Sequence, residues 1–277
     1  MPELPEVETI KRGLQNTVLN QTCNHVHIYT HKLRTPLPKD LAQVLTNNTI
    51  TKLSRRGKYL LIHLKNQHTL IMHFGMSGSL TITPTPPNTP KPPQPRQPHD
   101  HLIIETDHHT ITFNDPRRFG SIQLVHPDSS SPPLPNLAPD PLDPLFSPQH
   151  VHARLKQTTT PIKTALMNQN LISGLGNIYV CEALYHARLH PFTPSNQLDA
   201  RTTRRLLTHV RRVLTQAIEC GGSSLRDHKQ TNGKLGYFQY HFCVYGKDKQ
   251  PCPTCQTPIT KHRQQGRSTF FCPQCQK

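Results

Sequence analysis

The stretch MPELPEVET, Met1–Thr9, is the part of the sequence from which the rest of the chain is best interpreted. It contains Glu3, Glu6 and Glu8, three of only sixteen acidic residues in a chain that carries thirty-two Lys plus Arg. Carboxylates gathered at the end of a basic chain predict a chemical role, a helix start, or both. The two roles are compatible, because a helix would hold the first residues in a fixed place.

The helix interpretation follows from residue types and spacing. Pro5 suits the first helical position, and acidic residues are favourable in the first turn, where the helix dipole is positive. Apolar residues then recur at helical spacing and predict a buried face. They are Val7, Ile10, Leu14 and Val18.

The chemical interpretation concerns Pro2. Removal of Met1 before a small residue would leave a secondary amine at the chain end. A terminal amine has a pKa of about 7.7–8.0, against about 10.4 for lysine, so part of it is unprotonated and nucleophilic near neutrality. Glu3, one residue away, could carry protons for that amine. This chemistry requires an accessible Pro2 nitrogen.

Positive charge is concentrated in the second half of the chain. The net charge is +16 and the pI is about 9.8. Residues 1–150 hold fourteen Lys/Arg against eleven Asp/Glu, a net +3, and residues 151–277 hold eighteen against five, a net +13. We expect the second half to bind a polyanion, although charge alone does not separate DNA from RNA or anionic lipid. A solvated basic surface is the other interpretation.

The pattern of the chain predicts an α+β protein without membrane segments. No apolar run approaches the roughly 20 residues needed to span a bilayer, and no secretory signal opens the chain, so we expect a cytoplasmic protein. Period-two patterns and short apolar runs predict an antiparallel β-sandwich or barrel, whereas helical periods dominate after residue 151. The strand-like runs are 22–31, 49–55, 58–65, 68–74, 78–83, 101–106, 109–114 and 120–126.

Four predicted domain segments follow from these patterns. They are a domain with an amino-terminal helix and a β-sandwich over 1–126, a Pro- and Ser-rich linker over 127–150, a basic helical domain over 151–240, and a segment over 241–277 that contains the last cysteines.

Four cysteines at the carboxyl end carry the strongest chemical signal. Cys252-Pro-Thr-Cys255 and Cys272-Pro-Gln-Cys275 are two Cys-x-x-Cys pairs with sixteen residues between them. That spacing predicts one structural, tetrahedral zinc ion bound in a β-hairpin. Disulfides and redox catalysis are the alternatives, and the absence of an export signal and of a thioredoxin-like pattern argues against each.

Several turns present further candidates, each with an ordinary structural alternative. Met76, in a glycine-flanked turn, would usually be a core residue. Lys58 follows a tight turn, where a lysine is usually solvated. Asn177 follows the glycine-rich stretch Ile172–Gly176 between two predicted helices, and there it could bind phosphate or simply cap the second helix. His99-Asp100-His101 is better interpreted as a polar loop entering a strand than as a metal site.

Together these motifs resemble bacterial formamidopyrimidine-DNA glycosylases, which remove oxidised purines from DNA. The stretch MPELPEVET is closely similar to the start of these enzymes, and the later motifs follow in the same order as far as Lys277. The resemblance implies that residues 151–240 form a helix-two-turn-helix DNA-binding domain and that residues 241–277 form a four-cysteine zinc finger with a β-hairpin. It implies that Lys58, Asn177 and Arg267 hold the kinked strand, and that Met76, Arg117 and Phe119 fill the gap left by the extruded base. The implied catalytic residues are Pro2, Glu3, Lys58 and Arg267, and the implied DNA-binding residues are Met76, His99, Arg117, Phe119, Asn177 and Arg226.

The resemblance also implies a function and a partner. We expect a monomeric, nucleoid-associated enzyme that binds double-stranded DNA containing oxidised purines or abasic sites, removes the base through a Schiff base on Pro2, and cuts the strand by β,δ-elimination. An endonuclease VIII-type enzyme for oxidised pyrimidines is the nearest alternative. A zinc-containing protein that binds damaged DNA without catalysis is the second.

Overall fold

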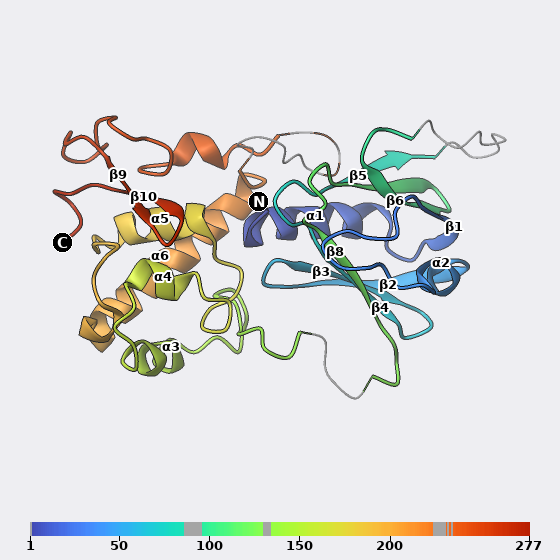
Figure 1. Cartoon of the computed structure of the whole chain (residues 1–277), viewed down its shortest axis with the longest axis horizontal. Helices are drawn as coiled ribbons and strands as arrows, with labels where there is room; N and C mark the ends of the chain where they lie inside the picture. The colour runs from blue at the N-terminus through green and yellow to red at the C-terminus, as the bar shows by residue number, and fades with distance from the viewer. Residues whose placement is uncertain (1, 86–95, 130–133, 224–230, 232, 234) are drawn as a thin grey trace. The chain divides into compact units, whose positions relative to one another are not determined.

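The computed structural model describes residues 2–85, 96–129, 134–223, 231, 233 and 235–277. The chain forms two compact units, each built from two stretches of sequence. Unit 1 comprises Met1–Pro135 and Cys220–Tyr237, and unit 2 comprises Asn136–Glu219 and Phe238–Lys277. Figure 1 shows the strands of unit 1 and the helices of unit 2. No helix in the described part of the chain is long and apolar enough to cross a bilayer.

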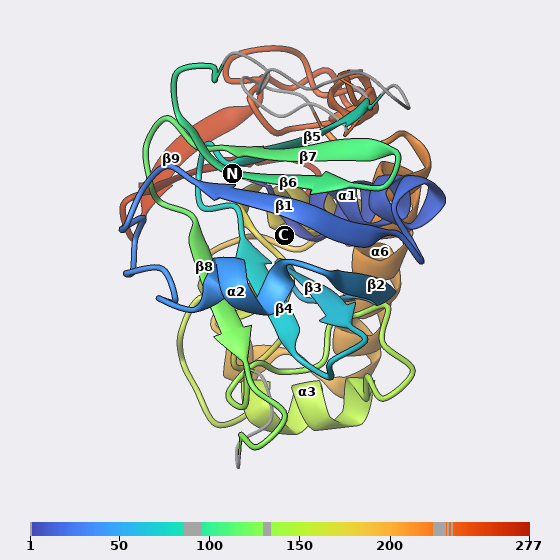
Figure 2. The same ribbon diagram turned by 90° about the vertical axis from the view of Figure 1, so that its right-hand side faces the viewer.

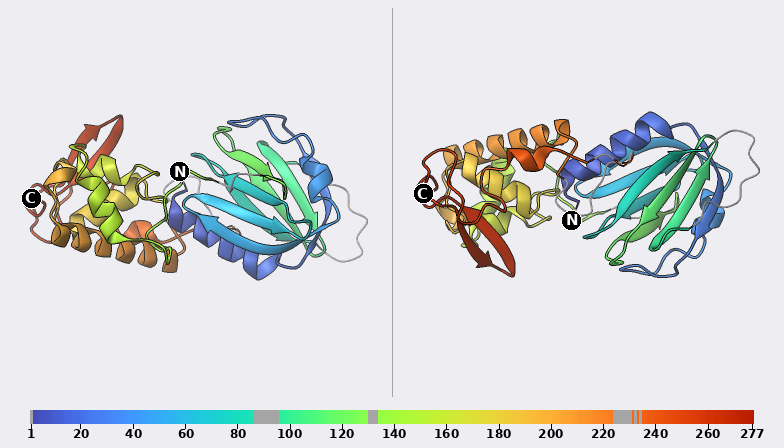
Figure 3. Two further views of the ribbon diagram at one scale, coloured as in Figure 1. Left: turned by 90° about the horizontal axis from the view of Figure 1, so that it is seen from below. Right: turned by 90° about the horizontal axis from the view of Figure 1, so that it is seen from above.

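Helix α1 (Leu4–Thr17) opens unit 1, with Glu3 as its N-cap and Pro5 in its first turn. The predicted apolar face is buried, because Val7, Ile10 and Leu14 have no exposed surface. This face packs against strands β2 and β3, as the two views of Figure 3 show. The first residues of the chain are therefore fixed to the sheet by a well-packed helix.

The sheet of unit 1 has eight strands in the order β5-β7-β6-β1-β2-β3-β4-β8, and every pairing is antiparallel. All eight lie where the sequence pattern placed them, so the predicted α+β class with an amino-terminal β domain is confirmed. The strands are β1 (Thr22–Ile28), β2 (Asn48–Arg56), β3 (Tyr59–Leu64), β4 (Thr69–His73), β5 (Ser79–Pro84), β6 (Asp100–Thr106), β7 (His109–Asn114) and β8 (Ser121–Val125).

The sheet consists of two four-stranded halves that share one core. Strands β1 and β2 join them through only two residue pairs, Thr22 with Thr49 and Cys23 with Asn48. Figure 2 shows the two halves as separate groups of strands. Buried side chains of both halves, of α1 and of the short helix α2 (Leu41–Leu45) form a single hydrophobic cluster. Helix α2 was not predicted, because five residues are too short to show a helical period.

Unit 2 is helical and ends in a β-hairpin. Helix α6 is strongly amphipathic, with its leucines and valines buried and its arginines exposed. The predicted domain boundaries stay predictions, and α3 begins inside the stretch expected to be a linker. The elements are α3 (Pro148–Leu155), α4 (Ile162–Leu166), α5 (Asn177–His186), η1 (Ser195–Gln197), α6 (Ala200–Glu219), η2 (Phe238–His241), β9 (Thr260–Gln264) and β10 (Arg267–Phe271).

Candidate active site and nucleic-acid interface

The start of α1 is fixed by a reciprocal cap between Glu3 and Glu6. The backbone N–H of Glu3 donates to Glu6 Oε2 at 2.9 Å, and the Glu3 side chain accepts from the Glu6 backbone N–H. The other oxygen of Glu6 accepts from the backbone N–H of Ser223 at 2.8 Å. Both glutamates are buried. Two carboxylates therefore hold the backbone directly behind Pro2 in one conformation.

Pro2 itself is buried in the chain that still carries Met1. The expected nucleophile therefore does not meet the requirement of accessibility in this unprocessed form. While Met1 is attached, the Pro2 nitrogen is also part of a peptide bond and has no basic lone pair. Removal of Met1 is therefore needed to create the amine.

Glu8, the third carboxylate of the opening stretch, has a structural role. Its oxygens lie 2.9 Å from Lys11 Nζ and 3.1 Å from Arg55 Nε. Burial by itself would raise the pKa of Glu8, but the hydrogen bonds and charges of Lys11 and Arg55 lower it below its usual value. Glu8 therefore stays ionised and ties α1 to β2.

Lys58 lies in the tight turn between β2 and β3 and is only 6% exposed. A lysine beside such a turn is usually solvated, but the fold buries the side chain of Lys58. Nearby His73 has a pKa lowered to about 4, first by burial and then by the charges of Lys58 and Arg34. His73 Nδ1 accepts from the backbone N–H of Gly75 at 3.1 Å, which requires this nitrogen to be unprotonated. Lys58 and the neutral His73 therefore lie together in a largely enclosed setting.

The turns that carry Met76 and Phe119 lie against each other. Ser77, beside Met76, donates through its hydroxyl to the carboxylate of Asp115, which is fully buried. The backbone N–H of Arg117 donates to the same hydroxyl at 3.2 Å. The Ser77 hydroxyl therefore joins two loops that are far apart in sequence.

The side chains at the tips of these turns are exposed. Met76 is 46% exposed and Phe119 is 42% exposed, so Met76 is not the core residue that its type suggests. The Arg117 guanidinium carbon lies 4.8 Å from the centre of the Phe119 ring, within the range of a cation–π contact. Unit 1 thus presents two apolar groups and one cation from a rigid double turn.

The loop before β6 contains another candidate, His99. Its side chain is exposed and its backbone is left-handed, with φ of 71°. The following Asp100 and His101 are buried and hydrogen-bonded to Asn114 Nδ2 and to the Asp115 carbonyl. This is the polar loop entering a strand that the sequence predicted. Arg226, the remaining candidate in unit 1, lies outside the described residues.

In unit 2, Asn177 is the first residue of α5, and Gly176 is the N-cap. The capping alternative for Asn177 is therefore wrong. Its Nδ2 donates to the carbonyl of Ser268 on β10 at 2.8 Å, which fixes the side chain against the hairpin. Its Oδ1 is buried and has no hydrogen-bond partner among the described residues. The glycine-rich turn allows this arrangement, since Gly174 adopts a φ of 85°.

Lys163 on α4 lies at the same hairpin. It is only 1% exposed, and its Nζ donates to the Ser268 carbonyl at 3.4 Å. Burial, and after it the charge of Arg267, lowers the pKa of Lys163 below its usual value. Lys163 and Arg267 line an open hollow of about 290 Å³, together with Asn168 and Gln265. An anion in this hollow would relieve the mutual repulsion of the two cations.

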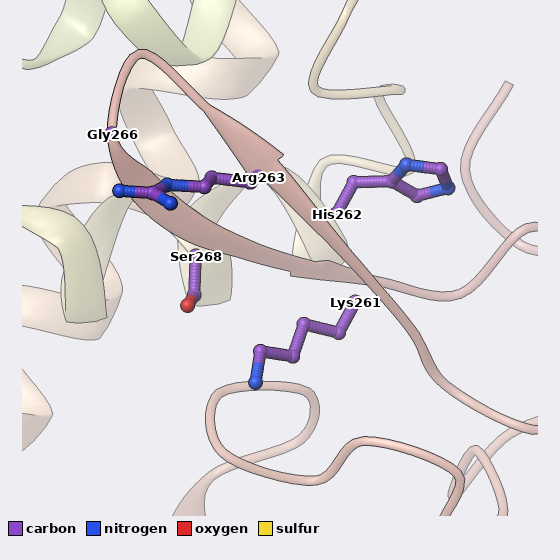
Figure 4. A pocket seen from close by; sticks show the side chains of 5 residues that line it. All are labelled: Lys261, His262, Arg263, Gly266 and Ser268. Carbon is purple, nitrogen blue, oxygen red and sulfur yellow. The ribbon is translucent and has the colours of Figure 1, made fainter.

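Strand β9 carries a second pair of cations. Figure 4 shows Lys261 and Arg263 directed to one side of β9 and His262 to the other, as strand alternation requires. With Gly266 and Ser268 they line an open hollow of about 460 Å³. The hairpin therefore offers basic groups on more than one face.

The four cysteines of the carboxyl end meet at one point. Their sulfur atoms all lie within 4.8 Å of one another, with Cys255 to Cys272 at 3.4 Å and Cys252 to Cys275 at 3.9 Å. A tetrahedral site with Zn–S bonds of about 2.3 Å requires sulfurs about 3.8 Å apart. Backbone N–H groups of Thr254 and Cys275 donate to the sulfurs of Cys252 and Cys272 at 3.4 Å each. The donor set fits one structural zinc ion, and all four cysteines are free of disulfides.

Three stretches of the chain match models of known protein families. Residues 1–122 match the family model of the formamidopyrimidine-DNA glycosylase N-terminal domain. Residues 137–229 match the H2TH domain of the same glycosylases, and residues 249–277 match the zinc finger found in FPG and IleRS. The chain belongs to the formamidopyrimidine-DNA glycosylase family.

Individual members of the family resemble the chain over its whole length. The formamidopyrimidine-DNA glycosylases of Paracoccus denitrificans and Jannaschia sp. are each 44% identical to it, with 100% of both chains covered. The crystal structure of the MutM (Fpg) protein of Thermus thermophilus has 38% identity and a TM-score of 0.86 over 99% of this chain and 98% of that one. Lactococcus lactis Fpg in complex with DNA containing an abasic site has 34% identity and a TM-score of 0.87 over 99% of each chain.

The sequence patterns did not identify three basic residues near the hairpin as candidates. They are Lys163, Lys261 and Arg263. A signal existed for the last two, because cations two residues apart in a strand share a face. Lys163 offered no such signal, since a lysine in an amphipathic segment is ordinarily exposed. Only the fold shows that its side chain is buried beside β10.

Proposed function

We propose that the nitrogen of Pro2, freed by loss of Met1, is the nucleophile of this enzyme. The chain is a DNA glycosylase with AP lyase activity that acts on formamidopyrimidine-containing and abasic-site DNA in base excision repair. The observation that carries the proposal is the reciprocal cap of Glu3 and Glu6, which holds the residue after Pro2 rigidly at the start of α1. Such a fixed position is what an attacking group needs.

The proposed reaction begins at the sugar of the damaged nucleotide. The Pro2 nitrogen forms a bond to C1′, the bond from C1′ to the base breaks, and the base leaves with its electron pair and a proton. Opening of the sugar ring converts the adduct into an iminium ion. Loss of a proton from C2′ then expels the 3′ phosphate, and a second elimination expels the 5′ phosphate. Water finally hydrolyses the iminium and regenerates Pro2.

Glu3 is proposed as the proton carrier of these steps. It adjoins Pro2 in the chain, and its own backbone is fixed by Glu6. A carboxyl group in this position can receive a proton from the attacking amine and protonate the ring oxygen as the sugar opens. Glu6 is proposed as a positioning residue, because its two oxygens are occupied by backbone N–H groups of Glu3 and Ser223.

The proposed phosphate contacts come from both units. In unit 2, Asn177 and Lys163 both donate to the Ser268 carbonyl, and Lys163 and Arg267 line the adjoining hollow, which supports binding of a phosphate group there. In unit 1, Lys58 is the enclosed cation. Arg267 offers a planar fork that matches two phosphate oxygens, whereas each lysine acts as a point charge.

The double turn of unit 1 is proposed to fill the gap in the base stack. Met76 and Phe119 are exposed apolar side chains, and Arg117 lies over the Phe119 ring. Inserted side chains offset the few kcal/mol that unstacking a base costs. His99 and Arg226 remain proposed DNA contacts. We also propose that the enzyme works as a monomer on oxidised purines, 8-oxoguanine included, in the bacterial nucleoid.

A lesion panel tests the proposed substrate. Duplexes containing 8-oxoguanine, a formamidopyrimidine or thymine glycol are incubated with excess enzyme, and base release and strand cleavage are measured separately. We expect rapid excision of the two purine lesions, with products carrying phosphate at both new ends. Preferential excision of thymine glycol would favour the endonuclease VIII-type function, and binding without cleavage would favour the non-catalytic one.

A further inference from the structure

A second group of metal-binding side chains lies in unit 2, close to the four cysteines but separate from them. Glu182 and His186 come from α5, and Cys243 comes from the segment after η2. One ligand atom from each residue lies within 4.8 Å of the other two, and Cys243 Sγ is 3.9 Å from His186 Nε2. None of these three residues has a place in the proposed reaction.

The backbone holds the three residues together without a metal ion. Glu182 and His186 are four residues apart on a helix and therefore share a face. The buried Glu182 carboxylate accepts three backbone N–H groups, from Cys243 at 2.8 Å, Val244 at 3.0 Å and Tyr245 at 2.8 Å. These bonds fix the Cys243 backbone beside α5. Glu182 and the Cys243 backbone are therefore preorganised beside the exposed His186 side chain.

We propose that Glu182, His186 and Cys243 bind a second divalent cation of the zinc class, with one coordination position open to water. Thiolate, imidazole and carboxylate are the donor set that zinc accepts, with bonds of about 2.3 Å to sulfur and about 2.0–2.1 Å to nitrogen. Such bonds place sulfur and nitrogen roughly 3.5 Å apart. Closing the present 3.9 Å separation needs only a small side-chain movement.

The surroundings suit ligation and access. His186 is exposed and Cys243 is half-buried, so an ion can enter from solvent, while Glu182 lies at the buried end. The metal displaces the thiol proton of Cys243 when it binds. The His209 ring stacks near that of His186, with 6.1 Å between the ring centres.

The test uses the full chain with its four-cysteine site already filled with zinc. Cobalt(II) is added as a spectroscopic probe, and bound cobalt and retained zinc are counted by mass spectrometry of the metals. We expect the wild type to bind one cobalt per chain without losing zinc, with a thiolate-to-cobalt absorption band. Cys243→Ser should abolish the band, and Cys243→Ser and His186→Ala should each weaken binding of the second ion at least about tenfold.

Matched controls separate this site from general cysteine or histidine chemistry. Cys220→Ser removes a half-buried cysteine, and His150→Ala removes an exposed histidine of unit 2, so neither should change the second ion. Retained zinc and an unchanged melting temperature show that each variant is folded. A wild type that binds only the structural zinc would overturn the proposal, as would equal cobalt binding by wild type, Cys243→Ser and His186→Ala. The outcome is independent of the proposed catalytic function.

Discussion

The start of α1 in unit 1 and the β9–β10 hairpin in unit 2 have opposite electrostatic designs. At the start of α1, buried carboxylates are satisfied within the protein, Glu6 by two backbone N–H groups and Glu8 by Lys11 and Arg55. At the hairpin, buried Lys163 lies close enough to Arg267 for the two charges to repel each other. Glu6 and Glu8 thus have partners inside unit 1, whereas Lys163 and Arg267 at the hairpin would gain from an added anion.

This difference assigns distinct roles to the two regions. A group that performs chemistry benefits from surroundings that are already satisfied, because no reorganisation is then needed during the reaction. A group that binds phosphate benefits from unsatisfied charge, since the ligand supplies the missing partner. We therefore expect DNA affinity to depend steeply on salt, and the rate of base removal in the bound complex to depend on it only weakly.

Zinc removal should produce the largest effect and should confine it to one region. Structural zinc contributes on the order of 10–16 kcal/mol to the folding of small zinc domains, so chelation should unfold the hairpin and abolish tight DNA binding. Hydrogen exchange would show lost protection over residues 249–277 and retained protection in β1–β8. Added zinc should restore both protection and binding. Hairpin amides that stay protected after complete zinc removal would contradict this prediction.

Acid should weaken unit 1 through His73. Its pKa is about 4 in the folded chain, whereas an unfolded histidine has about 6.5, so the unfolded state binds a proton first as the pH falls. The stability that neutral His73 provides is therefore complete above about pH 6.5 and is lost as the pH falls through about 4, by up to about 3 kcal/mol. Urea unfolding at several pH values measures it. The variant His73→Gln should lose this part of the pH dependence. A pH profile that is unchanged in the variant would show that His73 is not its cause.

Substitution of Arg267 should weaken binding with little change in bound-state chemistry. Loss of a hydrogen bond to a charged group costs about 1.5–3 kcal/mol, so Arg267→Ala should raise Kd by about tenfold or more. The slope of log Kd against log salt concentration should decrease by about 1, which corresponds to the loss of one phosphate contact. Arg154→Ala, which removes an exposed arginine of α3, is the matched control and should leave both values unchanged. Equal effects of Arg267→Ala and Arg154→Ala would show that the hairpin arginine has no special role in DNA binding.

Substitution of Phe119 should have the smallest effect of the series. The gap in the base stack is proposed to be filled by three side chains, so Phe119→Ala should cost only about 1–2 kcal/mol of lesion-complex stability. The loss should be absent on DNA in which the lesion is already unpaired and single-stranded. Leu145→Ala, at an exposed leucine of unit 2, serves as the control. An equal loss of complex stability on single-stranded DNA would show that Phe119 does not act by filling the gap in the base stack.

Much of the fold could be predicted because its signals are local. The face of α1, the strand alternation and the Cys-x-x-Cys pairs each occupy one short window of sequence. Helix α2 was missed because it is shorter than two turns. The start of α3 was missed because it lies in a Pro- and Ser-rich stretch, although Ser147 is a good N-cap and accepts from the His150 N–H.

The candidate site depended more on three-dimensional packing. The sequence placed Pro2 beside Glu3, but it could not show that Pro2 is buried or that Glu6 holds the Ser223 backbone. Without the family resemblance, nothing connected the Met76 turn with the Phe119 turn, because the Ser77–Asp115 pair that joins them spans thirty-eight residues. Burial of Lys163 likewise follows from tertiary packing, which side-chain type does not predict.

The central claim is that the amine of Pro2 forms the covalent bond to DNA. Borohydride reduction during reaction with an 8-oxoguanine duplex, followed by peptide mass spectrometry, tests it on chains prepared with and without Met1. We predict a stable adduct mapped to Pro2 in the processed chain and none in the chain that retains Met1. Equal adduct formation by both chains, or an adduct mapped to a lysine, would contradict the claim.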